Sequence, residues 1–135
     1  MDLVKAMRIS AAGMKVQGTR LRVISENLAN RDSLALGPNQ DPYARKVITF
    51  KNHLDRTLGV DLIEVHKITE SREGFQRVWD PQHPAADADG YVQSPNVNSF
   101  IELMDMREAQ RSYNANLNVI ETSRGMIQKT LDILR

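Results

Sequence analysis

Residues 99–135 read SFIELMDMREAQRSYNANLNVIETSRGMIQKTLDILR, and apolar side chains recur through them at alternating intervals of three and four residues. Eight of the ten positions in this series are apolar, which is the spacing of the a and d positions of a coiled coil. The apolar members are Leu103, Met106, Tyr113, Leu117, Ile120, Ile127, Leu131 and Leu134. Ser99 and Glu102 have the spacing of a capping box, which predicts that a helix begins at Ser99. A helix of about 36 residues is too long for a small domain to cover, so the pattern predicts a partner for its apolar stripe.

The N-terminal segment carries a matching pattern, with six of eight positions apolar at alternating intervals of four and three residues. The apolar members are Leu3, Met7, Met14, Leu21, Ile24 and Leu28. Asn30 is expected to end this helix, because asparagine tolerates the left-handed conformation found there. We call the fourteen apolar residues of the two series the packing stripes. The two helices either pack on each other alone or also pack on further subunits. The second interpretation is favoured, because an isolated antiparallel pair leaves part of its apolar flank exposed.

The region between the helices is expected to be a small β-rich insert. Residues 31–42 form a loop interrupted by Gly37-Pro38 and Asp41-Pro42, and strands are predicted at 43–50, 58–68 and 75–79. Residues 80–97 are expected to be an irregular connection. The predicted fold is therefore mainly α, with long N- and C-terminal helices that pair as a coiled-coil-like module. Its parts are the N-terminal helix at 1–32, the insert at 33–97 and the C-terminal helix at 98–135.

Composition excludes several classes of protein. The 135 residues allow one domain, a formal net charge of +1 favours no particular partner, and the absence of cysteine excludes disulfides and thiolate metal sites. Charged residues break every apolar run in the first 30 positions, so neither an ordinary signal peptide nor a membrane-inserted helix is expected. No zinc finger, aromatic-basic pattern or basic zipper is present, which argues against nucleic-acid binding.

No catalytic, cofactor-binding or metal-binding residue is predicted. Asp87-Ala88-Asp89-Gly90 is similar to part of a calcium loop, but in that register Ala85 and Asn96 occupy positions that need acidic ligands. The segment is therefore interpreted as a turn. The histidines at 53, 66 and 83 are scattered without ligand spacing. A hydrolase that uses Asp80, His83 and Asp87 is kept as an alternative, although no nucleophile motif or small-molecule site accompanies them.

Several short segments carry a resemblance to a known family. They are Ile9-Ser10-Ala11-Ala12-Gly13-Met14, the helix ending Asn27-Leu28-Ala29-Asn30, Pro42-Tyr43-Ala44-Arg45-Lys46, the block from Asp80 to Asp87 with Gly90-Tyr91-Val92, Pro95-Asn96-Val97-Asn98, Glu102-Leu103-Met104-Asp105-Met106 and the run from Ala109 to Asn116. In this order they resemble the bacterial flagellar rod and hook family of axial proteins across essentially the whole chain, and its proximal-rod members in particular. Ala12, Met14 and Ala85 depart from the usual residues by small changes.

The resemblance implies a structural role without enzymatic activity. It implies that the paired helices form an inner domain, and that many subunits stack helically into the hollow drive shaft that carries torque to the hook, as flagellum-dependent motility requires. The implied partners are copies of the chain, other rod proteins and the flagellar type III export apparatus, which would deliver the chain to the basal-body rod across the periplasm without a cleaved signal peptide. The rival interpretation is a soluble two-helix adaptor that binds one partner helix in the cytoplasm.

Overall fold

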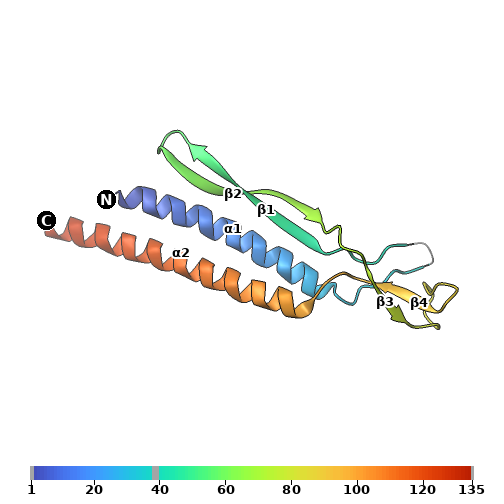
Figure 1. The fold of residues 1–135 in the computed structure, drawn as a ribbon. Coiled ribbons are helices and arrows are strands. Elements are labelled where there is room, and N and C mark those ends of the chain that lie inside the picture. The colour runs from blue at the N-terminus through green and yellow to red at the C-terminus, as the bar shows by residue number, and fades with distance from the viewer. Residues whose placement is uncertain (1, 38–39, 135) are drawn as a thin grey trace. The chain divides into compact units, whose positions relative to one another are not determined.

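The computed structural model describes residues 2–37 and 40–134, in the order helix, four strands, helix (Figure 1). These residues divide into two compact units. The first unit comprises Met1–Leu21, Thr49–Lys67 and Met106–Arg135, and the second comprises Arg22–Ile48 and Ile68–Asp105. The predicted loop breaker Pro38 and the predicted helix end Arg135 lie outside the described residues.

Helix α1 spans Leu3–Ala29, as its apolar periodicity predicts. The Asp2 carboxylate accepts a hydrogen bond from the Lys5 amide at 3.1 Å, so Asp2 caps a backbone donor that the first turn leaves without a partner. At the other end the Asn30 side-chain amide donates to the Glu26 carbonyl at 2.9 Å. The prediction that the helix ends at Asn30 is therefore confirmed, and the Asn30 side chain bonds back to the last turn.

Helix α2 spans Ser99–Ile133, and its start corrects one prediction. The cap is Asn98, whose side-chain oxygen accepts hydrogen bonds from the amides of Phe100 at 3.0 Å and Ile101 at 3.4 Å. The predicted capping box is wrong, because the Glu102 carboxylate does not turn back to Ser99. It is buried, and accepts hydrogen bonds from Asn27 and Arg45.

In the first unit, α1 packs antiparallel to α2. Arg20 forms an ion pair with Glu108 at 3.6 Å, and a Cβ atom placed on Gly13 would lie 2.9 Å from the side-chain nitrogen of Asn116. As the chain advances along α1, its contacts therefore move backward along α2. A groove of about 520 Å³ lies on α1, between Ala12 and Val16 and the strand residues 62–65. Helix α1 is thus the element of this unit that both α2 and the strands adjoin (Figure 1).

Strands β1 (Lys46–Asp55) and β2 (Val60–Glu70) form an antiparallel two-stranded sheet. Between them the Asp55 carboxylate accepts hydrogen bonds from the amides of Thr57 and Leu58, and Gly59 has a φ of 64°, a conformation that favours glycine. The strands predicted at 43–50 and 58–68 are confirmed in type but shifted toward the C-terminus. Residues 51–54 of β1 are all exposed and three of the four are polar, so this part lacks the alternation from which sequence predicts a strand.

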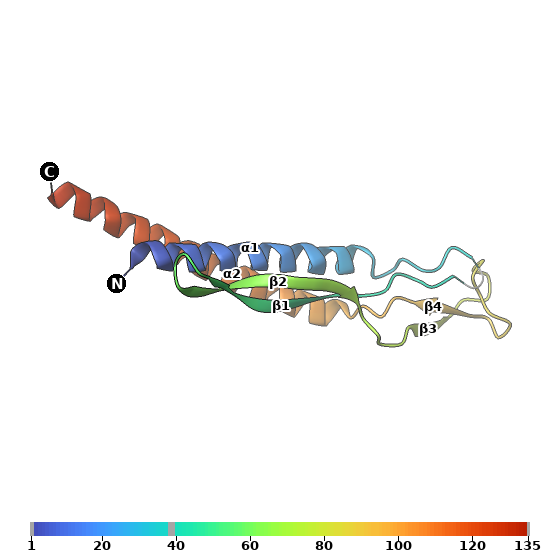
Figure 2. The same ribbon diagram turned by 90° about the horizontal axis from the view of Figure 1, so that it is seen from above.

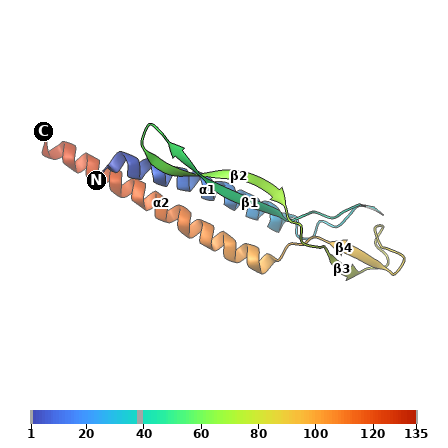
Figure 3. The ribbon, with the colours of Figure 1, turned by 45° about the horizontal axis from the view of Figure 1, so that its top comes forward.

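In the second unit, β3 (Gln76–Trp79) pairs with β4 (Tyr91–Ser94) in antiparallel register, with Trp79 opposite Tyr91 (Figure 2 and Figure 3). The strand predicted at 75–79 is confirmed. The expectation that 80–97 is irregular throughout is wrong, because it contains β4. Only Val92 of this four-residue strand is buried, which leaves almost no hydrophobic pattern to detect.

The buried apolar residues are few and mostly small: Val16, Val23, Ile24, Ala35, Val92, Val97 and Ala109. On α2 the most buried positions are Glu102, Ala109 and Ser123, one residue before Leu103, Gln110 and Arg124 of the predicted series. The small side chains of Ala109 and Ser123 let two helices approach closely, and larger apolar residues then flank the line of closest contact. The coarse prediction, two paired long helices with a small strand-rich insert, is confirmed.

Candidate functional site

The packing stripes differ in how far the chain itself covers them. Ile24 is buried, and ten others are half-buried: Leu3, Met7, Met14, Leu21, Leu28, Met106, Tyr113, Leu117, Ile120 and Ile127. Leu103, Leu131 and Leu134 are exposed by 50%, 61% and 79%. The predicted series did not contain Phe100, Met104 and Ile133, which are also exposed on α2. Contact of these residues with another subunit stays a prediction.

A cluster of polar side chains is buried at the end of α1 in the second unit. The Asn27 side-chain amide donates to the Lys46 carbonyl at 2.9 Å and to Glu102 at 3.2 Å. Its oxygen accepts from the Tyr43 hydroxyl at 2.9 Å and from the Lys46 amide at 2.8 Å. Burial raises the pKa of Tyr43 above its ordinary value, so the hydroxyl is a donor at neutral pH. All the main hydrogen-bonding capacity of Asn27 is therefore used inside the protein.

Glu102 is 0% exposed and bridges the start of α2 to the segment before β1. One carboxylate oxygen accepts from Asn27 and the other from the Arg45 guanidinium, which also lies 3.9 Å from Asp105. A buried carboxylate is costly unless it is paired and hydrogen-bonded, and both conditions are met here. The cluster thus supplies the charge and the donors that burial of Glu102 requires.

Asn96 completes the cluster. Its side-chain oxygen accepts from the Arg45 amide at 2.7 Å, and its nitrogen donates to the Glu73 carbonyl at 2.8 Å. We call Asn27, Tyr43, Arg45, Asn96 and Glu102 the polar junction.

Beside the polar junction, Lys46 and Glu26 form an ion pair at 2.9 Å. The hydrogen bond from Lys46 lowers the pKa of Glu26 and raises that of Lys46. Both side chains remain partly exposed, so water screens this pair far more than the pair within the polar junction.

Sequence reasoning identified the stretches that form the polar junction without predicting their contact. Asn27 belongs to the helix ending that resembles the axial family, and Tyr43 and Arg45 belong to the Pro-Tyr-Ala-Arg-Lys stretch. Asn96 and Glu102 belong to two further motifs. The resemblance thus contained a signal for the site, but the residues bonded to Glu102 lie 75 and 57 positions away in the sequence. The remaining family-motif residues lie at the helix end, where Leu28 is half-buried, Ala29 exposed and Asn30 half-buried.

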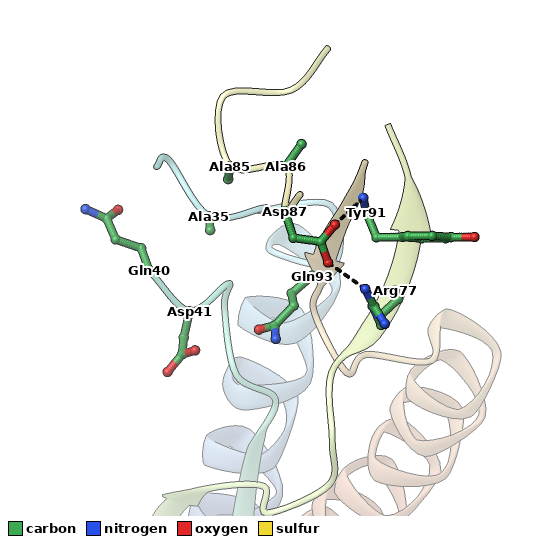
Figure 4. Close-up of a pocket in the computed structure, with 9 residues that line it drawn as sticks. All are labelled: Ala35, Gln40, Asp41, Arg77, Ala85, Ala86, Asp87, Tyr91 and Gln93. Carbon is green, nitrogen blue, oxygen red and sulfur yellow. Dashed lines mark hydrogen bonds and ion pairs between the residues drawn. The ribbon is translucent and has the colours of Figure 1, made fainter. Parts of the chain in front are cut away.

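The segment that is similar to a calcium loop is a turn, as predicted. Asp87 accepts hydrogen bonds from the backbone amides of Asp89 at 3.0 Å and Tyr91 at 2.8 Å, and pairs with Arg77 (Figure 4). The Tyr91 amide and then the Arg77 guanidinium hold the pKa of Asp87 below its ordinary value. Gly90 has a φ of 83°, and a Cβ atom there would lie 3.1 Å from Pro81. The Asp87 carboxylate is thus occupied in closing the loop between β3 and β4.

A hollow of about 570 Å³ adjoins this loop (Figure 4). Its lining includes Gln40, Asp41, Arg77 and Gln93. In the alternative hydrolase set, Asp80 accepts from the Gln82 amide and His83 from the Ala85 amide, so both shape the same loop. Among residues 2–37 and 40–134, no three acidic or histidine side chains are grouped to hold a metal ion. Neither helix, over its described length, is long and apolar enough to cross a membrane.

Sequence similarities to known proteins extend along nearly the whole chain. The flagellar basal-body rod protein FlgC of Agrobacterium fabrum is 47% identical over 133 residues, which cover 98% of this chain and 96% of that protein. The chain belongs to the FlgC family of flagellar basal-body rod proteins. The FlgC proteins of Salmonella typhimurium and Bacillus subtilis are 35% and 33% identical, each over 98% of this chain. Residues 88–133 also match the family described as flagellar basal body rod FlgEFG protein C-terminal.

Membership in the FlgC family confirms the resemblance that the motifs indicate. The family consists of structural, non-enzymatic proteins, which decides against the hydrolase alternative. The candidate functional features of this family member are therefore packing surfaces and the polar residues that position them. They are the exposed apolar side chains of α2 and the polar junction.

Proposed function

We propose that this chain is a structural subunit of the proximal flagellar basal-body rod, and that it works by packing against neighbouring rod subunits. The observation that carries the proposal is its similarity to FlgC proteins over 98% of the chain. Flagellum-dependent motility follows from the family. In this proposal residues 1–32 and 98–135 form an inner coiled-coil-like domain, and residues 33–97 form an insert between its helices.

The exposed residues of α2 support packing on other subunits. Gly13 lies opposite Asn116 and Arg20 opposite Glu108, so the start of α1 lies opposite about residue 126 of α2. Leu131 lies beyond that point, where α1 no longer covers the stripe. Burial of one leucine side chain is worth about 1.5–3 kcal/mol before the cost of association, so a few such contacts repeated along a rod are substantial.

The proposed partners are copies of the chain and other rod proteins, which assemble helically into a hollow shaft that transmits torque. The chain is proposed to reach the rod across the periplasm through the flagellar type III export apparatus, without a cleaved signal peptide. The proposal requires no small-molecule substrate, cofactor, nucleic acid or membrane insertion. The charge balance supports it, since the formal net charge of +1 favours neither nucleic acid nor an anionic membrane surface.

The test is an in-frame deletion of the gene, followed by electron microscopy of envelope fractions and a motility assay. The proposal predicts non-motile cells whose basal bodies lack a complete rod. It also predicts that a plasmid copy of the gene restores motility and complete rods. A tagged, functional copy should co-purify with basal bodies. Complete rods in the deletion strain would contradict the proposal, and motility without the chain would contradict it independently.

A further inference from the structure

Four segments that are distant in the sequence meet at the polar junction within the second unit. The end of α1 contributes Asn27, the segment before β1 contributes Tyr43 and Arg45, the segment after β4 contributes Asn96, and α2 contributes Glu102. Asn27, Asn96 and Glu102 are buried. The hydrogen bonds among these residues leave each of the three side chains with partners inside the chain.

The polar junction holds both ends of the hairpin formed by β1 and β2. At the entry, Asn27 bonds both the amide and the carbonyl of Lys46, and Asn96 accepts from the Arg45 amide. At the exit, the Ser71 amide donates to the Arg45 carbonyl at 2.7 Å, and Asn96 donates to the Glu73 carbonyl. One asparagine therefore joins the entry to α1, and the other joins the entry to the exit.

We propose that the polar junction is a latch that couples helix pairing to hairpin attachment, so that the two form and open as one cooperative step. If the helix ends paired while the hairpin detached, Glu102 would lose Arg45 and Asn27 would lose Lys46 and Tyr43. Both side chains would remain in the space between the helices with unsatisfied polar atoms, a state that is strongly disfavoured. If the hairpin remained attached while the helices separated, Asn27 would lose Glu102, and Arg45 would lose its buried carboxylate.

This arrangement also makes pairing specific. An apolar contact between the helices would tolerate sliding, whereas the hydrogen bonds of Glu102 and Asn27 form in one register only, as polar residues at coiled-coil seams do. The coupling is a property of the folded chain and does not depend on rod assembly. Its test is therefore independent of the test of the proposed function.

The experiment is native-state hydrogen exchange on the purified full-length chain across a urea series, with trimethylamine N-oxide added where a folded baseline requires it. The informative amides are those of Lys46 and Ser71 at the hairpin ends, and those in the last turn of α1 and near Glu102 in α2. The latch predicts that the opening free energies of all these amides decrease together, with the same dependence on urea concentration. Separate curves for the hairpin ends and the helix ends would overturn the proposal, as would helix protection without hairpin protection.

Two variants and a matched control sharpen the test. Asn27→Ala and Glu102→Gln are each expected to lower protection of the Ser71 amide by roughly tenfold or more, although neither residue bonds to Ser71. Glu108→Gln is the control, because it is the same substitution in the same helix at a carboxylate that is largely exposed in its pair with Arg20. It is expected to leave Ser71 protection unchanged. Wild-type protection of Ser71 in both junction variants would overturn the proposal.

Discussion

Gly13 and Gly18 of α1 are expected to respond differently to substitution by alanine. Glycine costs a helix interior about 1 kcal/mol relative to alanine, so both positions offer the same gain in helix propensity. A Cβ atom at Gly18 meets nothing within 4 Å, whereas at Gly13 it would lie 2.9 Å from the Asn116 side-chain nitrogen and 3.0 Å from its oxygen. Gly18→Ala should therefore raise the free energy of unfolding by about 1 kcal/mol.

At Gly13 the same gain is offset by movement of Asn116. That side chain donates to the Ser112 carbonyl at 2.9 Å, and loss of such a hydrogen bond costs about 0.5–1.5 kcal/mol. Gly13→Ala should therefore be close to neutral, about 1 kcal/mol less stable than Gly18→Ala. Gly13→Val adds two methyl groups to a contact already tight, and overpacking of this kind costs about 1–3 kcal/mol.

The assay is urea unfolding of the full-length chain followed by circular dichroism, with trimethylamine N-oxide held constant. A difference of about 1 kcal/mol corresponds to a shift of roughly 0.3–1 M in the urea midpoint, because m values in urea are about 1–3 kcal/mol/M. The expected order of stability is Gly18→Ala, then wild type together with Gly13→Ala, then Gly13→Val. If Gly13→Val were as stable as Gly18→Ala, the close approach of α2 to α1 at Gly13 would be refuted.

Three further predictions concern the second unit. Gly90→Ala should destabilise the chain by about 1–2 kcal/mol because its φ is 83° and Pro81 is close, whereas Gly74→Ala, with open space around it, should change the unfolding midpoint little. The Glu26–Lys46 pair lowers the pKa of Glu26 from 4.5 and raises that of Lys46 from 10.5. Its contribution to the stability of the folded chain is therefore complete between about pH 4.5 and 10.5. It is lost as pH falls through the lowered pKa of Glu26 or rises through the raised pKa of Lys46. NMR titration checks both directions, and a Glu26 pKa at or above 4.5 would contradict the pair. Trp79, the one tryptophan, is 67% exposed, so acrylamide should quench its fluorescence nearly as well as that of free tryptophan, and strong shielding in the isolated chain would count against this exposure.

The long helices could be predicted from sequence because their signal is local. Apolar residues at alternating intervals of three and four residues identify a helix over any stretch of several turns, and α2 begins at Ser99, as expected. The exact contact line of α2 could not be predicted in this way. Apolar periodicity detects the large residues that flank a close helix contact, whereas the contact itself uses small or polar residues such as Ala109 and Ser123.

The contacts of the polar junction could not be predicted from local sequence patterns, because they join residues that are distant in the sequence. At the start of a helix, Ser99 and Glu102 have the spacing of a capping box, and that local pattern carries no information about Arg45 or Asn27. The folded chain supplies stronger partners for Glu102 than the orphan amides of its own first turn, and Asn98 then caps the helix. Strand β4 was missed because a four-residue strand with one buried side chain has no detectable alternation.

The central claim is that exposed apolar residues of α2 join this chain to neighbouring subunits of the flagellar rod. The most direct measurement complements the deletion strain with Leu131→Asp and counts complete rods by electron microscopy of purified basal bodies. Leu131 is 61% exposed, so this variant should keep the wild-type circular dichroism spectrum while rod completion and motility are lost. Gln128→Asp, an exposed polar position on the same helix, is the matched control and should restore both. Complete rods and normal motility with Leu131→Asp would contradict the claim.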